Sequence, residues 1–344
     1  MNRRMWSDLT LSIEPENRRD LLRVREGKMS FLKIYKFLLH GVLKLAGISP
    51  RTIEIEPGTI MNFWVPTETI NNTNTKRKKP AVVFLHGFGF DGILTWQFQA
   101  LALAKEYSVY VPDFLFFGGS ITDKTERSVE FQAECMAKGL RKLGVEKCTL
   151  VGFSYGGMVG FKMAEMYPDL VESMVVTCSV MALTESISNA GLERIGFPSW
   201  ADYLLPVSVK GVETLLQVAT YSFPKLPNWI YKDILEGIFI YRKEKVELLE
   251  ALVISDKEFT IPCYQQNIYL LWGQNDKIFD LGTARNLKQQ IREKASLEYI
   301  EKSGHLVQLE RPFVYNSHLK KILASLWSKE KSHATDAFPQ PKKK

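Results

Sequence analysis

The sequence predicts an α/β protein with a mostly parallel sheet of about eight strands, helices on both faces and one helical insertion. Short apolar runs alternate with amphipathic segments over residues 80–180 and again over residues 265–327, which is typical of parallel strands joined by helices. Residues 181–264 break this alternation with aromatic residues and with prolines between short helical patterns. The chain has 344 residues, 45% of them apolar, so it is long enough to bury a large core.

The same pattern divides the chain into five segments. They are an N-terminal leader with an amphipathic helix (1–50), the first part of the core (51–180), a helical lid (181–264), the second part of the core (265–327) and a basic C-terminal tail (328–344). No internal repeat of fixed period is visible, which favours one interrupted core over a repeat array.

Residues 31–46 predict the first helix. Lys33, Lys36, His40 and Lys44 recur at spacings of three, four and four residues, which places one polar stripe on a helix that is otherwise apolar. Such a helix either packs against its own domain or lies on a membrane surface, and the sequence leaves both open. Residues 1–28 are polar without a clear period and read as a leader.

The core elements then follow in order. Residues 52–56 and 59–65 alternate apolar and polar side chains around Pro57-Gly58, which predicts a β-hairpin, and residues 67–79 read as a loop. Further strands are expected at 81–85, 108–111, 148–153, 171–178, 267–272 and 297–300. Helices are expected at 93–105, 129–143, 155–166, 283–294 and 306–326.

Composition excludes several classes of function. The net charge of +7 combines an excess of +7 within residues 1–80 and +3 within residues 326–344 with −3 between them, so no nucleic-acid partner is expected.

The four cysteines form no CxxC pair and lack a histidine at ligand spacing. They are interpreted as reduced, mostly buried thiols, and no metal or cofactor is expected. Without a secretory signal or a run of about 20 apolar residues, the chain is expected to be intracellular, most simply cytoplasmic, and not transmembrane.

A serine between two glycines is the strongest chemical motif. Gly152-Phe153-Ser154-Tyr155-Gly156 fits the pattern G-x-S-x-G. The pattern follows a predicted strand and opens a predicted helix, and a turn this sharp leaves no room for side chains two residues either side of the serine. Ser154 is therefore a candidate nucleophile at a strand-to-helix turn.

A serine nucleophile needs a base, and the base needs a carboxylate. Among five histidines, His305 is the best candidate base because it lies in a loop just after the last predicted strand. The other four are placed less well, in the first helix, a different turn, the closing helix and the tail: His40, His86, His318 and His333. Asp276, shortly after the strand at 267–272, is the favoured carboxylate. Asp280 is near enough to be the alternative, but it ranks lower because an N-cap role at the start of the next helix explains it.

A developing oxyanion needs two fixed N–H donors. The backbone N–H of Tyr155 is one candidate because it directly follows the serine. The N–H of Phe88 is the other, in the glycine-containing turn His86–Phe90 after the strand at 81–85, where His86 would hold the shape of the turn. A plain tight turn remains the alternative reading of this segment.

With HGFGF, GFSYGG, WGQND and SGH in this order on successive strands, residues 52–327 resemble a serine hydrolase of the α/β-hydrolase fold. The resemblance implies the roles of nucleophile, acid and base for Ser154, Asp276 and His305, and of oxyanion donors for Phe88 and Tyr155. More narrowly, FLKIYKFLLHGVLKLAG, DFLFFGGS and GFSYGGMVG are similar to a plant branch described as lipase-like or esterase-like. Epoxide hydrolases and haloalkane dehalogenases share the fold but use an aspartate at this turn, so Ser154 argues against both.

The leading functional hypothesis is hydrolysis of carboxylic esters with apolar acyl or aryl groups, with residues 181–264 as a lid over the site. Three alternatives stay open: a small-molecule receptor that retains the triad, an acyltransferase, and a carbon–carbon bond hydrolase, which is disfavoured because residues 181–264 show no convincing acid-binding arginine pattern. Peripheral membrane contact through residues 31–46 is a separate hypothesis. The motifs do not indicate an oligomeric state.

Overall fold

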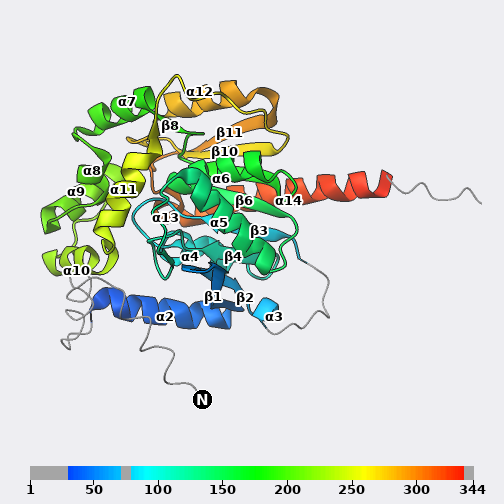
Figure 1. Cartoon of the computed structure of the whole chain (residues 1–344), viewed down its shortest axis with the longest axis horizontal. Helices are drawn as coiled ribbons and strands as arrows, with labels where there is room; N and C mark the ends of the chain where they lie inside the picture. Colours follow the sequence, from blue (N-terminus) through cyan, green and yellow to red (C-terminus); the bar gives the residue numbers. More distant parts are fainter. Residues whose placement is uncertain (1–29, 71–78, 337–344) are drawn as a thin grey trace, which may run out of the picture.

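The computed structural model describes residues 30–70 and 79–336 (Figure 1). The expected leader, residues 1–28, and the last eight residues of the expected tail lie outside the described residues. No helix in the described part of the chain combines the length and the hydropathy needed to cross a membrane.

Within the described residues, the central sheet has nine strands in the order β1-β2-β4-β3-β6-β7-β10-β11, with β5 paired to β2. Strands β1, β2 and β4 pair antiparallel, and the strands from β4 to β11 pair parallel. The bounds are β1 Ile48–Glu56, β2 Thr59–Pro66, β3 Ala81–Leu85, β4 Ser108–Pro112, β5 Ile121–Thr122, β6 Cys148–Phe153, β7 Val171–Thr177, β10 Asn267–Gly273 and β11 Ala295–Ile300. The predicted mostly parallel sheet of about eight strands is confirmed.

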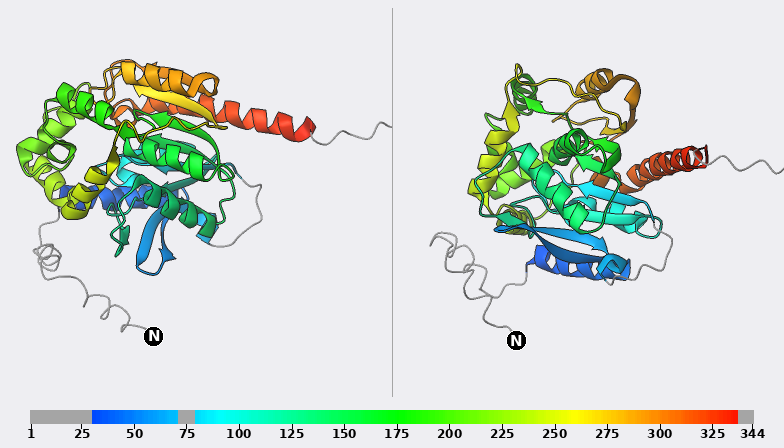
Figure 2. Two further views of the ribbon diagram at one scale, coloured as in Figure 1. Left: turned by 45° about the horizontal axis from the view of Figure 1, so that its top comes forward. Right: turned by 45° about the vertical axis from the view of Figure 1, so that its right-hand side comes forward.

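Helices cover both faces of this sheet. In Figures 1 and 2, α5 (Val129–Lys142) and α6 (Tyr155–Met166) lie on one face, and α4 (Gly92–Leu103) and α14 (Pro312–Asp336) on the other. The remaining core helices are α3 (Thr67–Ile70), α12 (Leu281–Ile291), the 3₁₀ turn η1 (Arg292–Lys294) and α13 (Val307–Glu310). Because both faces are covered, the central strands are almost continuously buried, as their apolar sequences require.

The end of the chain differs from the prediction. Instead of one helix over residues 306–326, the structure has the short helix α13 and then α14, which begins at Pro312 and continues to Asp336. Proline lacks the N–H that would continue α13 but suits the first position of a new helix. Because no Gly or Pro follows Leu326 before Pro339, the sequence holds no stop signal where the helix was expected to end. The short helix α3 likewise replaces part of the loop expected at 67–79.

An insertion of five helices lies between β7 and β10. Its helices are α7 (Glu185–Ile195), α8 (Trp200–Leu204), α9 (Val209–Ala219), α10 (Asn228–Ile238) and α11 (Arg242–Leu252). Prolines 198, 206, 224 and 227 lie between these helices, and the Ser199 and Ser208 side chains cap α8 and α9. The two-residue parallel strands β8 (Leu183–Thr184) and β9 (Val253–Ile254) join the beginning and end of the insertion.

Helix α2 (Phe31–Leu45) lies along the edge of the molecule beside β1 and reaches α10 (Figure 1). The Ser30 hydroxyl caps it by accepting a hydrogen bond from the Lys33 N–H at 3.1 Å. Leu32, Leu39 and Leu43 face the domain and are buried. The helix therefore packs on its own domain, one of the two arrangements that its sequence leaves open.

Candidate active site

Ser154 lies at a sharp turn between β6 and α6, with a φ of 52° and a ψ of −121°. A Cβ added to Gly156 would lie 2.3 Å from the Leu85 carbonyl oxygen, and one on Gly152 would lie 2.6 Å from the Gly156 carbonyl oxygen. The backbone is thus too close on both sides for any residue but glycine. The Ser154 N–H donates to the Thr177 carbonyl at 3.0 Å, which ties the turn to the neighbouring strand.

Asp276 and His305 meet behind this turn. Asp276 follows β10 and His305 follows β11, and the His305 Nδ1 lies 2.8 Å from the Asp276 Oδ2. The other carboxylate oxygen of Asp276 accepts hydrogen bonds from the Ile278 and Phe279 N–H groups at 2.7 and 3.1 Å. Since Asp276 is only 5% and His305 only 4% exposed, the pair is held rigidly and away from water.

Asp280, the alternative carboxylate, has another position. Its side chain caps α12 by accepting from the Thr283 N–H at 2.8 Å, and it pairs with Arg194 at 3.1 Å. These hydrogen bonds hold the pKa of Asp280 below its ordinary value although partial burial opposes them. The structure therefore brings Asp276, and not Asp280, into contact with His305.

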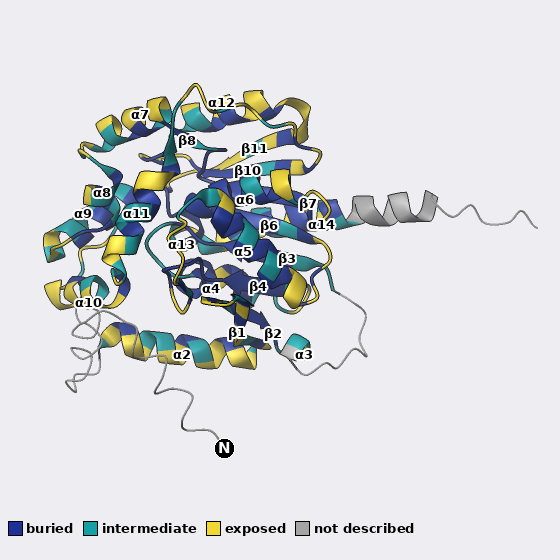
Figure 3. Ribbon diagram, in the orientation of Figure 1, coloured by how far each residue is buried: buried dark blue, intermediate teal, exposed yellow. Residues whose placement is uncertain are grey.

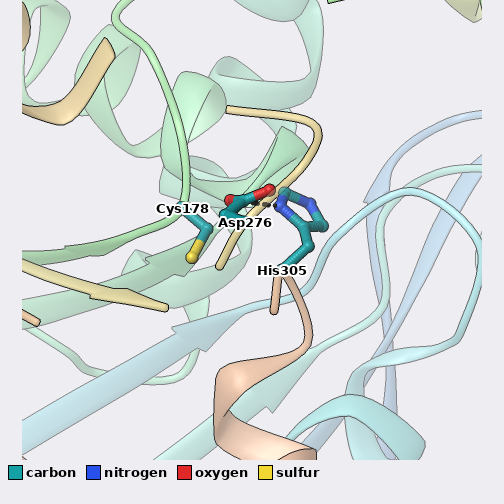
Figure 4. A group of neighbouring side chains, drawn as sticks. All are labelled: Cys178, Asp276 and His305. Atoms are coloured by element: carbon teal, nitrogen blue, oxygen red, sulfur yellow. Dashed lines mark hydrogen bonds and ion pairs between the residues drawn. The ribbon is translucent and has the colours of Figure 1, made fainter. Parts of the chain in front are cut away.

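Cys178 is a third buried side chain in this group, and no motif indicated that it would lie beside Asp276 and His305 (Figure 4). One potential ligand atom from each of Cys178, Asp276 and His305 lies within 4.8 Å of the others. Burial, and then the charge of Asp276, raise the pKa of the Cys178 thiol well above its ordinary value, so the thiol is neutral. A metal site needs a thiolate. A neutral thiol beside an aspartate and a histidine that are hydrogen-bonded to each other therefore fits a hydrogen-bonded network better than a metal site.

His86 shapes the turn that contains Phe88. The His86 Nδ1 lies 2.8 Å from the Gly87 carbonyl, and its Nε2 accepts a hydrogen bond from the Phe114 N–H at 2.9 Å. Because complete burial lowers the pKa of His86 to about 4, the ring is neutral and carries its proton on Nδ1. His86 thus connects the turn to the segment after β4.

The two candidate oxyanion donors have free backbone N–H groups. Within residues 30–70 and 79–336, neither the Phe88 N–H nor the Tyr155 N–H donates a hydrogen bond. Tyr155 is the first residue of α6, so no carbonyl of that helix can accept from it. The rings of Phe88 and Tyr155 are in edge contact at 5.7 Å between centroids, which places the two residues side by side.

One pocket joins these residues. Ser154, His305, Phe88 and Tyr155 all line it, whereas Asp276 lies behind His305. The rest of the lining is almost wholly apolar, and the insertion supplies much of it through Trp200, Tyr203, Leu204, Leu215, Ala219, Phe239, Leu249 and Leu252. An apolar cavity with a few convergent polar groups is the usual form of a small-molecule site.

The Ser154 hydroxyl and the His305 imidazole share this pocket, but no hydrogen bond joins them among the described residues. Such contacts are often long in unliganded enzymes and shorten when substrate binds. His40 instead packs on Trp64, and His318 bonds to Glu298; neither lines the pocket. The side chain of His333 lies outside the described residues.

Three known proteins illustrate the relationships of the chain. It is 26% identical over 282 residues to monoacylglycerol lipase ABHD6 of Bos taurus, covering 75% of this chain and 79% of the relative. It is 23% identical over 267 residues to epoxide hydrolase 3 of Xenopus tropicalis, covering 72% of each. The solved structure of a bacterial membrane phospholipase A superposes with a TM-score of 0.70 at 23% identity, covering 86% of this chain and 91% of the other, which shows a shared fold.

A family model described as "alpha/beta hydrolase fold" matches residues 80–312. That region contains the serine turn, the Asp276–His305 pair and the whole insertion. The sheet order and the covering helices agree with this match. The chain therefore belongs to the alpha/beta hydrolase fold family.

Proposed function

We propose that this protein hydrolyses carboxylic esters with apolar acyl or aryl groups by way of an acyl-enzyme. The observation that carries the proposal is the pocket that Ser154 and His305 share, with His305 bonded to a buried carboxylate at 2.8 Å and apolar side chains over the rest of the wall. An apolar wall desolvates an acyl chain, and a serine beside a paired histidine is the arrangement that acyl transfer requires.

In the proposed mechanism Ser154 attacks the acyl carbonyl while His305 accepts its proton through Nε2. Asp276 holds the imidazole by its Nδ1–H and stabilises the imidazolium. The Phe88 and Tyr155 N–H groups donate to the oxyanion, and His305 returns the proton to the leaving alcohol. Water, activated by the same histidine, then hydrolyses the acyl-enzyme and regenerates Ser154.

The insertion has the role of a lid in this proposal. Helices α8, α9 and α11 contribute apolar lining, and Phe239 follows α10. A lid closed over the pocket would exclude water from an apolar substrate. The narrower resemblance to a plant lipase-like or esterase-like branch, the intracellular location and the absence of a nucleic-acid partner stay predictions.

The direct test is turnover of a short p-nitrophenyl ester by the wild-type protein and by Ser154→Ala. We expect kcat to fall by about a thousandfold or more, because the nucleophile is lost. Ser222→Ala, in the exposed segment after α9, serves as the matched control and should keep wild-type turnover. If Ser154→Ala hydrolyses the ester as fast as the wild type, the assignment of Ser154 is wrong.

The same assay separates the alternative functions. A receptor that retains the triad would bind the ester and turn it over only slowly, and Ser154→Ala would lose even that slow turnover. An acyltransferase would give mostly the new ester when a second alcohol is added, because the alcohol replaces water at the acyl-enzyme. Slow ester cleavage together with rapid cleavage of a ring-fission product would indicate a carbon–carbon bond hydrolase.

A further inference from the structure

Helix α2 has two apolar faces, and only one of them is covered. Leu32, Leu39 and Leu43 face the domain. On the other side lie six exposed apolar residues with exposed fractions from 37% to 91%: Phe31, Ile34, Phe37, Leu38, Val42 and Leu45. Their spacing places them along one stripe of the helix, and α2 borders the molecule in Figure 3 with exposed residues along it.

The stripe continues onto the insertion. Trp229 of α10 is 58% exposed, and its ring meets that of Phe31 edge-on at 5.8 Å between centroids. The two helices are also joined by a hydrogen bond of 2.6 Å from the Leu32 N–H to the Asp233 carboxylate. We call the six α2 residues and Trp229 the apolar stripe; it forms one continuous surface over two helices.

The charges beside the stripe are positive. Residues 30–53 contain Lys33, Lys36, Lys44 and Arg51 and no acidic residue. Lys36 pairs with Asp91 at 2.6 Å, whereas Lys33 and Lys44 are exposed on the helix side next to Phe37. On α10, Asp233 is bonded to α2, and Glu236 pairs with Lys232 at 3.7 Å.

From these observations we propose that the apolar stripe docks the protein on a membrane surface that contains anionic lipid. An exposed apolar face with flanking lysines and an exposed tryptophan has the chemistry of the boundary between headgroups and acyl chains. The absence of acidic residues from residues 30–53 favours a negatively charged bilayer over a protein partner of mixed charge. Without such docking, an uncovered apolar surface of this kind promotes association between protein molecules.

Docking through the stripe would bring the pocket close to the bilayer. Asp91, the partner of Lys36, directly follows Phe90, and Phe239 directly follows α10; both phenylalanines line the pocket. Membrane lipids with ester bonds would then lie next to the pocket as substrates. This extension rests on the proposed ester hydrolysis. The docking itself does not, and Ser154→Ala should bind vesicles as the wild type does.

The test is co-sedimentation of the full chain with phosphatidylcholine vesicles containing about 30% phosphatidylserine, and with pure phosphatidylcholine vesicles. We expect binding to the mixed vesicles to be about tenfold tighter and to weaken as salt is raised. The protein could instead sediment without vesicles, and a charged substitution in the stripe could abolish that sedimentation. This result would show that the stripe joins two copies of the chain and would overturn the proposal.

Matched variants test the surface itself. Phe37→Glu should weaken vesicle binding about tenfold or more, because Phe37 is 76% exposed in the stripe. Phe313→Glu is the control, because Phe313 is 88% exposed on α14, away from α2, and should bind as the wild type does. Circular dichroism checks that each variant is folded.

The charge contribution has its own pair of variants. Lys33→Glu combined with Lys44→Glu should abolish the preference for phosphatidylserine, and Lys288→Glu combined with Lys294→Glu, both exposed near the end of α12, should preserve it. No binding by the wild type, or equal binding by folded Phe37→Glu and Phe313→Glu, would refute the proposal. Loss of vesicle binding with unchanged hydrolysis of a short soluble ester would support it.

Discussion

The two walls of the pocket are built in different ways. On the core side, Ser154, Phe88 and Tyr155 are fixed by backbone at the ends of parallel strands, where glycines let main chains approach within van der Waals distance. On the insertion side, the wall consists of apolar side chains on short helices joined by proline-containing loops. A backbone wall tolerates almost no change of shape, whereas a side-chain wall can repack.

Replacing a glycine on the core side and one on the insertion side should give the largest difference in stability between the two walls. A Cβ at Gly156 would meet the Leu85 and His86 carbonyl oxygens at 2.3 and 2.5 Å, and neither backbone atom can move without distorting β3. A Cβ at Gly191 of α7 would meet the Trp200 ring at 3.2 Å, and a side chain can shift by the few tenths of an ångström required.

We therefore expect Gly156→Ala to lower the free energy of unfolding by about 3 kcal/mol or more, or to prevent folding. Gly191→Ala should change it by less than about 1 kcal/mol, because alanine also favours the helix. Urea denaturation measures both. Equal losses in the two variants would show that the core turn is no more rigid than the insertion.

The next effect is a pH dependence on the core side. The pKa of His86 is about 4 in the folded protein because of burial, whereas an unfolded histidine titrates near pH 6.5. Since the unfolded chain takes up this proton first, the stabilisation is complete above pH 6.5 and is lost as the pH falls toward 4. The free energy of unfolding should fall by up to about 3 kcal/mol across this range from His86 alone.

Denaturation of the wild type and of His86→Gln at several pH values isolates this contribution, because the other titrating groups are common to both. Glutamine keeps one N–H donor group and one carbonyl acceptor but does not titrate. NMR titration of the His86 ring in the wild type gives an independent reading if the variant does not fold. A His86 that protonates near pH 6.5 in the folded protein would contradict the assigned neutral, buried ring.

The smallest expected effect lies on the insertion side. Leu249 of α11 is 4% exposed and lines the pocket, so Leu249→Trp should fill space that a long acyl chain needs. We expect the ratio of kcat/KM for a long-chain over a short-chain p-nitrophenyl ester to fall about tenfold. Leu249→Met, which conserves volume, should keep the wild-type ratio. An unchanged ratio in folded Leu249→Trp would show that this part of the pocket does not bind the acyl chain.

The difference between the core side and the insertion side also explains which features the sequence could predict. Strands β3 and β6 and helix α6 have the expected bounds because each is a continuous apolar or periodic run that ends at a glycine or a turn. The contact between Asp276 and His305 agrees with the expected pairing, since parallel strands bring their carboxyl ends to one edge. Their catalytic roles remain the proposal made above.

Other features depend on contacts that no local pattern reveals. Cys178 directly follows β7 with a φ of 48° and lies beside Asp276, whereas the sequence indicated no more than a buried thiol. The polar stripe of α2 was visible, but which of its two apolar faces packs on the domain was not. The split of the closing helix was readable from Pro312, yet the prediction treated residues 306–326 as continuous.

The central claim is that Ser154 is an activated nucleophile on the core-side wall of the pocket. It is tested most directly by labelling the folded protein with a fluorophosphonate and mapping the modified peptide by mass spectrometry. The account predicts one label, on Ser154, that is absent from Ser154→Ala and strongly reduced in His305→Ala. A wild-type protein that stays unlabelled, or a label that persists in folded Ser154→Ala, would contradict it.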